Sequence, residues 1–384
     1  MESASIVTFI RKIFHTEGFV PLHAPVFAGN EKKYVLDTIE STFVSSVGAY
    51  VDKAENMIKQ ITGAKYAVAT VNGTSALHIA LILAETSENC EVITQPVSFV
   101  ATCNAIRYTG ATPVFVDVDA DTMGMSPESL AAFLKENAFV ENGQCFNVKT
   151  KKRIAACVPM HSFGFPCRIV EIKKICADYH IELIEDSAES LGSKVGDVHT
   201  GMFGRMGVLS FNGNKIVTSG GGGMIITDDE VLAKRAKHIT TTAKVPHSWE
   251  YKHDEIGYNY RMPNINAALI CAQLEQLAVF LQGKRLLANE YEQFFSASEI
   301  DFVVERENTV ANYWLNTIVL PSKADRDNFL EYSNANNVMT RPIWQLMTQL
   351  EMYRENQRTD IPNARYLQDH VVNIPSSFRP WTVA

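Results

Sequence analysis

Residues 207–224 read GVLSFNGNKIVTSGGGGM. The apolar run at the start predicts a short buried strand, and Lys215 follows it in a loop of small residues. A lysine in such a loop loses much of its solvation, so its amine gives up its charge more easily and can condense with an aldehyde. Most single lysines are solvated surface charges instead. The rest of the sequence therefore has to decide between a reactive and an exposed lysine.

An aspartate ends a second predicted strand, upstream of this loop. Residues 181–185 read IELIE, a run typical of a buried parallel strand, and Asp186 follows directly. In sheets of this kind the strand ends carry the functional groups. A lone aspartate at a strand end is more often a salt-bridged structural carboxylate, but the combination with Lys215 favours a functional site.

A turn between a predicted strand and a predicted helix suits a phosphate group. Residues 72–75 read NGTS, and apolar residues at helical spacing follow them. The start of a helix offers free backbone N–H groups at the positive end of the helix dipole, here beside two hydroxyl groups. A plain helix N-cap explains the same residues equally well. Only the presence of Lys215 turns the interpretation towards a phosphate site.

Two nucleotide-binding interpretations fail. The glycines at 220–223 precede the apolar run 224–227, which predicts a strand, whereas the dinucleotide fingerprint must open a helix. The sequence also contains no Gly-Lys-Ser or Gly-Lys-Thr, which excludes a phosphate-loop NTPase. These glycines are instead expected to let the backbone pack closely beside the lysine loop.

Strands and helices are predicted to alternate through the first two thirds of the chain. The predicted strands are 66–70, 91–95, 113–118, 153–159, 182–185, 207–211 and 224–227, and the helices between them are 75–84, 99–109, 127–136 and 170–179. Residues 139–152 are largely polar and are expected to form a surface excursion. This alternation predicts an α/β fold with a mainly parallel, seven-stranded sheet covered on both faces.

The two ends of the chain follow other patterns. An amphipathic segment to His15 and prolines further on predict an N-terminal arm, and two helices follow, at 31–40 and 51–62. After Tyr258 the sequence predicts one long helix, 264–293, then strands near Phe302 and over 313–320, and a helix over 323–336. We therefore expect three parts: an arm (1–28), a large domain (29–250) and a small α+β domain (251–384).

Composition excludes several classes of protein. The net charge is −8 and charges of both signs are interspersed, which argues against nucleic acid as a partner. The seven cysteines form no Cys-x-x-Cys pair and have no histidine pair at zinc spacing, so reduced thiols and no metal are expected. No signal peptide or membrane span is predicted, so we expect a cytoplasmic protein without membrane contact.

Five motifs together resemble a known family. In chain order they are NGTSAL (72–77), SFVAT (98–102), EDSAE (185–189), SFNGNK (210–215) and GYNYRM (257–262). The sequence resembles the DegT-type (DegT/DnrJ/StrS) nucleotide-sugar aminotransferases, which depend on pyridoxal 5'-phosphate, over nearly its whole length. The segments 21–27, 42–48 and 211–215 look most like the subgroup of legionaminic-acid-type C4 aminotransferases.

The resemblance implies a fold, a cofactor and a set of site residues. The fold would be that of the type I pyridoxal-phosphate transferases, aspartate aminotransferase-like, in which the large domain binds the cofactor. Lys215 would be the catalytic residue, carrying the cofactor and moving the substrate proton. Asp186 would keep the ring nitrogen protonated, and Phe99 would stack on the ring. The full set of implied cofactor-binding residues is Gly73, Thr74, Ser75, Phe99, Asp186, Glu189, Ser210, Lys215 and Asn259.

Two positions depart from the family pattern. Glu189 stands where the family often has glutamine, and Thr348, in the stretch 341–348, stands where relatives often have histidine. His161 follows a predicted strand and would either line the site or be a satisfied structural histidine. No catalytic step is assigned to it.

The resemblance also implies substrates and partners. The donor would be L-glutamate and the acceptor a UDP-linked 4-keto-6-deoxy-N-acetylhexosamine, for surface polysaccharide, lipopolysaccharide or nonulosonic acid biosynthesis. The working unit would be a homodimer with shared sites, in which Asn259 reaches the neighbour's phosphate. The alternatives are a sugar dehydratase, which has histidine at the lysine position, and a non-catalytic cofactor-binding regulator.

Overall fold

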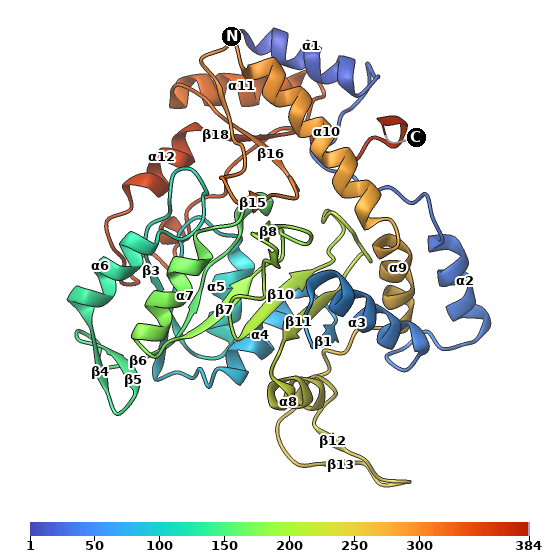
Figure 1. The fold of residues 1–384 in the computed structure, drawn as a ribbon, viewed down its shortest axis with the longest axis vertical. Helices are drawn as coiled ribbons and strands as arrows, with labels where there is room; N and C mark the ends of the chain where they lie inside the picture. Colours follow the sequence, from blue (N-terminus) through green and yellow to red (C-terminus); the bar gives the residue numbers. More distant parts are fainter. Residues whose placement is uncertain (383–384) are drawn as a thin grey trace.

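A nine-stranded sheet lies at the centre of the computed structural model, which describes residues 1–382 (Figure 1). Seven strands follow the order β1-β11-β10-β7-β6-β2-β3, and β11 is antiparallel to both of its neighbours, while β10 to β3 run parallel. The predicted mainly parallel sheet is confirmed. The seven strands are β1 (Tyr66–Thr70), β2 (Cys90–Thr94), β3 (Thr112–Phe115), β6 (Arg153–Val158), β7 (Glu182–Asp186), β10 (Met206–Ser210) and β11 (Gly223–Thr227).

Helices cover both faces of this sheet because successive strand residues point to opposite sides. Val208 packs in the core beneath α4 and α8, whereas its neighbour Leu209 packs in the core shared with α3 and α9. Similarly, Ile93 belongs to the core under α6 and α7. The helices concerned are α3 (Ala49–Thr62), α4 (Gly73–Leu83), α5 (Val100–Tyr108), α6 (Pro127–Asn137), α7 (Ile169–Asp178), α8 (Glu230–Thr240) and α9 (Asn264–Leu274).

The segment 139–152, expected to be a surface excursion, forms a mostly exposed hairpin, whose two strands were not predicted. Strands β4 (Ala138–Glu141) and β5 (Gln144–Asn147) pair antiparallel, and β5 also pairs with β6 at Phe146 and Arg153. The polar residues masked the strand pattern because most of the hairpin is exposed to solvent. The hairpin adds the eighth and ninth strands to the sheet.

The long helix predicted over 264–293 is wrong, because the chain bends by 57° between α9 and α10 (Leu277–Phe295). No glycine or proline marks the break. Glu275 at the bend is bonded by Asn30, Tyr34 and Lys53, which come from other parts of the chain. Tertiary packing against α2 (Glu31–Glu40) and α3 thus ends the first helix. Within residues 1–382 no single helix has the length and apolar character of a membrane span, although α9 and α10 would have them if counted together.

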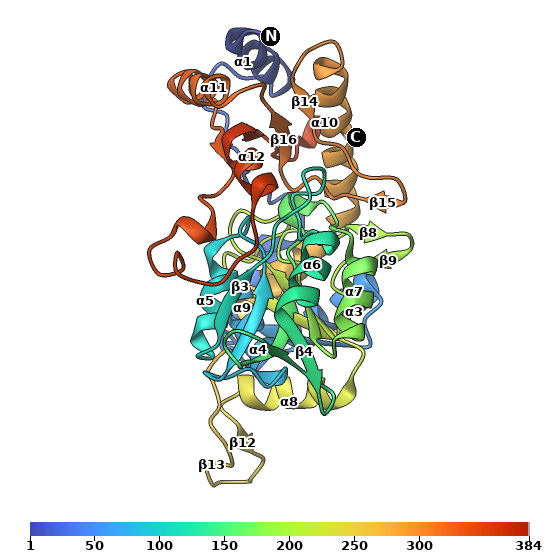
Figure 2. The same ribbon diagram turned by 90° about the vertical axis from the view of Figure 1, so that its left-hand side faces the viewer.

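A smaller antiparallel sheet packs above the large one (Figure 2). Its order is β14-β16-β18-β17, and the N-terminal helix α1 (Ser3–Ile13) shares its core with α10 and α11. The division into an arm, a large domain and a small domain stays a prediction. The elements are β14 (Asp301–Phe302), β16 (Asn316–Val319), β17 (Arg341–Pro342), β18 (Val371–Ile374), α11 (Lys323–Ala335) and α12 (Pro362–His370).

Two further small sheets were not predicted. One has the order β15-β8-β9, with β15 (Thr309–Val310), β8 (Lys194–Val195) and β9 (Val198–His199). It joins the segment just before β16 of the small sheet to the segment between β7 and β10 of the large sheet. At the opposite end, β12 (Lys244–Val245) and β13 (Lys252–His253) form a hairpin that projects from the body of the molecule (Figures 1 and 2).

Candidate active site

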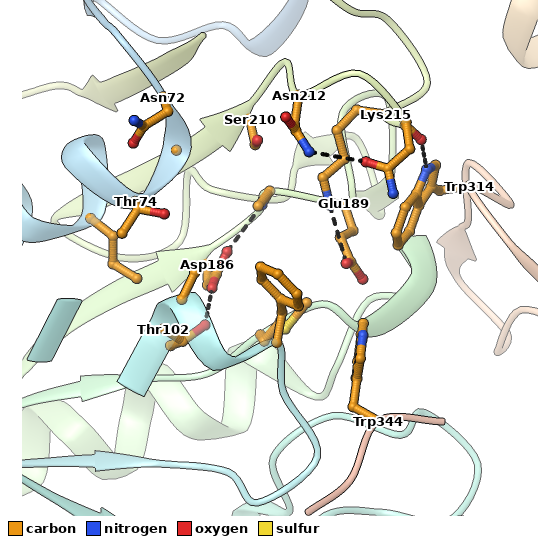
Figure 3. A pocket seen from close by; sticks show the side chains of 17 residues that line it. Asn72, Thr74, Thr102, Asp186, Glu189, Ser210, Asn212, Lys215, Trp314 and Trp344 are labelled. Atoms are coloured by element: carbon orange, nitrogen blue, oxygen red, sulfur yellow. Dashed lines mark hydrogen bonds and ion pairs between the residues drawn. The ribbon is translucent and has the colours of Figure 1, made fainter. Parts of the chain in front are cut away.

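A cavity of about 370 Å³ opens where the strands of the large sheet end, facing the small sheet (Figure 3). Its floor is formed by the ends of β7 and β10 and by the start of α4, and two tryptophans come from the small sheet's side. The lining residues are Asn72, Gly73, Thr74, Leu77, Phe99, Ala101, Thr102, Met160, Asp186, Ala188, Glu189, Ser210, Asn212, Asn214, Lys215, Trp314 and Trp344.

The start of α4 presents free backbone donors to the cavity. Asn72 is the N-cap, and its side chain accepts the Ser75 N–H at 2.7 Å. A Cβ atom at Gly73 would lie 2.9 Å from the Ser210 Cβ, so only glycine lets this helix approach β10 so closely. The backbone donors of Gly73 and Thr74 and the Ser210 hydroxyl therefore converge on one spot suited to a phosphate.

Close packing was predicted for the glycines at 220–223, and two of the four show it. A Cβ atom at Gly222 would lie 2.7 Å from the Ser219 hydroxyl of the lysine loop, whereas one at Gly223 would lie 2.4 Å from the Asn72 carbonyl oxygen. The missing side chain of Gly223 thus lets β11 pass directly behind the start of α4. At Gly220 and Gly221 a Cβ atom would meet no atom closer than 3.7 Å.

Lys215 points into the cavity with its amine held on two sides (Figure 3). Its Nζ donates to Glu189 Oε1 at 3.2 Å and lies 4.1 Å from the centre of the Trp314 ring. The indole N–H of Trp314 in turn donates to the Asn214 carbonyl at 2.7 Å, which fixes the ring against the lysine loop. The side chain of Lys215 is only 13% exposed, so the interpretation as a solvated loop lysine does not hold.

Asp186 is fixed at the end of β7 by two donors. The Thr102 hydroxyl donates to its Oδ2 at 2.7 Å and the Ala188 N–H to its Oδ1 at 3.2 Å. No cation bonds to this carboxylate within residues 1–382, so it is not the salt-bridged structural residue of the alternative interpretation.

Phe99 is 51% exposed at the cavity, which excludes a core role and leaves a ring face open.

Glu189 is a buried carboxyl group next to the lysine. Its second oxygen accepts the Phe163 N–H at 2.8 Å, and its side chain is 1% exposed. Burial raises the pKa of Glu189 to about 7, against the opposing influence of Lys215 and of the Phe163 N–H. Phe163 holds a left-handed φ of 56°, unusual for a non-glycine residue, and this places its N–H towards Glu189.

Glu185 and His161 serve the fold rather than the cavity. Both side chains are fully buried, with His161 Nε2 3.0 Å from Glu185 Oε2. The same carboxylate accepts backbone N–H groups from Gly201, Phe203 and Gly204. His161 is therefore the satisfied structural histidine of the two interpretations considered above.

The structure brings together seven of the nine predicted site residues and leaves two outside. Ser75 is buried in the first turn of α4 and does not line the cavity. Asn259 is exposed on the loop before α9, away from the cavity of its own chain. The seven that line the cavity are Gly73, Thr74, Phe99, Asp186, Glu189, Ser210 and Lys215.

The two tryptophans were not predicted. Trp344 stacks on Phe163, with ring centres 4.6 Å apart, and Trp314 stacks on the same residue with ring centres 6.4 Å apart. Both belong to segments far from the motifs in sequence, where an aromatic residue usually indicates core packing. Thr102 is the last residue of the motif at 98–102. Its bond to Asp186 could have been expected only by placing the start of α5 beside the end of β7.

These residues fit pyridoxal phosphate. A cluster of N–H and hydroxyl donors suits the phosphate, an exposed phenyl face suits an aromatic ring, and a fixed carboxylate without a cation suits a protonated ring nitrogen. Lys215 supplies a primary amine at the same cavity. Lys215, Asp186, Phe99 and the start of α4 would hold the cofactor.

Comparisons with known proteins agree with this fit. A model of the DegT/DnrJ/EryC1/StrS aminotransferase family matches residues 26–379. The chain is 35% identical over 358 residues to the GDP-perosamine synthase of Escherichia coli O157:H7, covering 93% of each chain. It is 31% identical over 360 residues to the GDP-perosamine synthase of Vibrio cholerae, covering 93% of this chain and 94% of that one. The aminotransferase TlmJ from Streptoalloteichus hindustanus has a similar structure, with a TM-score of 0.85 and 23% identity over 94% of each chain.

Proposed function

Because the chain belongs to the DegT/DnrJ/EryC1/StrS family of pyridoxal-phosphate-dependent sugar aminotransferases, we propose that it moves the amino group of L-glutamate to carbon 4 of a nucleotide-linked 4-keto-6-deoxy sugar. The observation that carries the proposal is the Lys215 amine, held in one cavity with Asp186 and the donors at the start of α4. The presence of a lysine at position 215 also argues against the sugar dehydratase, which has histidine there. The Lys215 amine is hydrogen-bonded to Glu189 and lines the cavity, which argues against a regulator without turnover.

Each part of the site has a separate task in this reaction. Pyridoxal phosphate, when bound, supplies an electron-withdrawing ring that stabilises negative charge on the amino-acid α-carbon. Asp186 would hold a proton at the ring nitrogen, and Phe99 would cover one face of the ring. Lys215 accepts and returns the proton of the α-carbon, which requires its amine to be uncharged when it acts as a base. Gly73, Thr74 and Ser210 anchor the phosphate.

Two observations support a sugar acceptor. The cavity reaches beyond the lysine to Trp344, which is only partly buried, and the flat face of an indole suits the apolar face of a hexose ring. Two relatives, 35% and 31% identical, are named for making GDP-perosamine, a nucleotide-linked sugar. We retain the UDP-linked N-acetylhexosamine as the acceptor proposed from the sequence, together with its subgroup. The relatives' names favour a GDP-linked acceptor as a second candidate.

A panel of acceptors tests the proposal. Purified protein loaded with pyridoxal phosphate is incubated with glutamate and with UDP-linked and GDP-linked 4-keto-6-deoxy sugars, the corresponding free sugars, and pyruvate. We expect 2-oxoglutarate to form fastest with one of the two nucleotide-linked sugars, and the amino product to be identified by mass spectrometry. Faster turnover with pyruvate than with every nucleotide sugar would contradict the sugar acceptor.

We further propose a homodimer with shared sites. Tyr258 and Tyr260 both pack against His78 of α4, so Asn259 between them faces solvent. Nearby surfaces also expose large apolar side chains that a monomer would leave in water: Phe43, Val44, Val47, Trp249, Tyr251 and Ile256. A second copy of the chain would cover them and could receive the neutral amide of Asn259 at its phosphate site.

Mixing two inactive variants tests the sharing. Lys215→Ala and Asn259→Asp subunits are expected to be inactive or strongly impaired alone. A mixed dimer places both lesions in one site and leaves the other intact, so up to about a quarter of wild-type activity should return after random exchange. Exchange is verified with differently tagged subunits. No recovery in verified mixed dimers would rule out shared sites.

We also propose a cytoplasmic location and a role in the biosynthesis of surface sugars. All seven cysteines are unpaired and buried, which supports a reducing compartment such as the cytoplasm. An amino sugar attached to a nucleotide is an activated donor, which supports a role in polysaccharide, lipopolysaccharide or nonulosonic acid biosynthesis. We also retain the division into an arm (1–28), a cofactor-binding domain (29–250) and a small domain (251–384).

A further inference from the structure

Glu189 and Lys215 form an ion pair inside the cavity, and within residues 1–382 neither has another charged hydrogen-bond partner. We propose that this pair shares one exchangeable proton, so that Lys215 becomes an uncharged amine by passing its proton to Glu189 rather than to water. The use of that amine in catalysis rests on the function proposed above, but the sharing of the proton is a property of the chain itself.

The geometry holds the carboxyl group ready for this transfer. Glu189 Oε1 lies 3.2 Å from the lysine Nζ, and its Oε2 is fixed by the Phe163 N–H at 2.8 Å. The Glu189 carbonyl also accepts the Asn312 side-chain amide at 2.9 Å, which ties this residue to the small sheet's side of the chain. In the transfer one Nζ–H bond breaks and one Oε1–H bond forms. No other reactant is required.

Burial of the carboxylate reduces the free-energy difference between the ion pair and the neutral pair. A charged carboxylate away from water is costly, and burial raises the pKa of Glu189 to about 7, opposed by Lys215 and the Phe163 N–H and reinforced by Asp186. The positive charge of Lys215 is therefore a main influence that keeps Glu189 ionised. When that charge disappears, Glu189 is expected to take up a proton, so the two groups titrate as a unit.

Among residues 1–382, Lys215 is the one cation paired with this carboxyl group. His23 of the arm approaches the lysine loop, but burial and then the charges of Lys284 and Lys215 hold its pKa well below the ordinary value, so it is neutral. Lys284 on α10 is fully buried, donates to the Trp314 and Ser376 carbonyls, and burial also lowers its pKa. A glutamine, which the resemblance leads one to expect at position 189, could not take up a proton at all.

Labelling of the cofactor-free chain tests the proposal. A small amine-reactive acylating reagent is applied at a series of pH values, and the label on Lys215 is quantified by mass spectrometry. A proton shared within the pair makes the uncharged fraction of Lys215 independent of pH above the pKa of Glu189. We therefore expect the labelling rate, corrected for reagent hydrolysis, to change less than about threefold between roughly pH 7.5 and 8.5.

The variant Glu189→Gln serves as the comparison. There Lys215 can lose its proton only to water, so its labelling rate should rise about tenfold over the same pH unit. The exposed Lys234, paired with Glu230 at the surface, should show the tenfold rise in both proteins and controls for the reagent. A tenfold rise at Lys215 in the wild-type chain would overturn the proposal.

An infrared measurement keeps the proposal testable even if Glu189→Gln is unstable. In cofactor-free Lys215→Met at about pH 8, Glu189 should be protonated and show the carbonyl stretch of a carboxylic acid. The band should persist when the exposed Glu331 of α11 is also changed to Gln, and disappear when Glu189 is changed. Absence of the band in Lys215→Met would show that Glu189 stays ionised without the lysine, and would overturn the coupling. Neither experiment needs the sugar or the amino donor, so each is independent of the proposed reaction.

Discussion

Replacing Lys215 with alanine is expected to lower turnover of glutamate and nucleotide sugar by about a thousandfold or more, because a positioned proton carrier contributes on that order. No other lysine lines the cavity within residues 1–382, so no neighbouring amine can take its place. The phosphate donors at the start of α4 remain, and the variant should therefore still bind pyridoxal phosphate. Initial rates of 2-oxoglutarate formation measure the loss.

A matched control and a chemical label accompany this prediction. Lys234→Ala removes an exposed lysine of α8 and should leave turnover unchanged. Wild-type protein should be yellow, and reduction with borohydride should attach the mass of the cofactor to the peptide that contains Lys215. Label on a different lysine, or substantial activity in Lys215→Ala, would remove the central assignment.

The change of Asp186 to asparagine is expected to reduce turnover by roughly a hundredfold or more, the size of effect seen when one fixed electrostatic group is lost from a reacting centre. Asparagine has nearly the same shape. Its Oδ1 can still accept the Ala188 N–H, and its amide can donate to the Thr102 hydroxyl, which then acts as an acceptor, so the strand end should keep its structure. What it loses is the negative charge that favours a protonated ring nitrogen.

Absorbance of the bound cofactor separates this loss from a loss of binding. The Asp186→Asn protein should still take up pyridoxal phosphate, with turnover reduced at saturating cofactor. Glu182→Gln, at the other end of the same strand and paired with Arg205 at the surface, should behave like wild type. Undiminished turnover in Asp186→Asn would mean that the carboxylate is structural after all.

Motif residues at strand ends could be predicted because their roles depend on local structure. A short apolar strand leads the chain to Asp186 and another to Ser210, and a parallel sheet brings such ends to one edge. The helix start at Gly73 follows from its cap and from the glycine itself. These elements form from nearby residues, so pattern and spacing were sufficient.

The bend between α9 and α10 shows where that reasoning stopped. The apolar pattern runs through residues 264–293 with no glycine or proline at the bend, because Gly283 lies inside α10, and it predicts one helix. Glu275 meets Lys53 and Tyr34 at the bend, and those contacts exist only in the folded chain. The hairpin of β4 and β5 was missed for another reason: most of it is exposed, so its polar residues show no strand pattern.

The sequence by itself determined the parallel sheet and placed Lys215, Asp186 and the turn at Gly73 next to strand and helix ends, because each of these elements has a local pattern. Only the tertiary structure decided what surrounds them. Trp314 and Trp344 reach the cavity from the small sheet's side. One oxygen of Glu189 accepts the Lys215 amine, and the other accepts the N–H of Phe163, which has a left-handed backbone conformation. Such contacts join residues distant in sequence, and packing between separate layers, rather than any local preference, sets their distances.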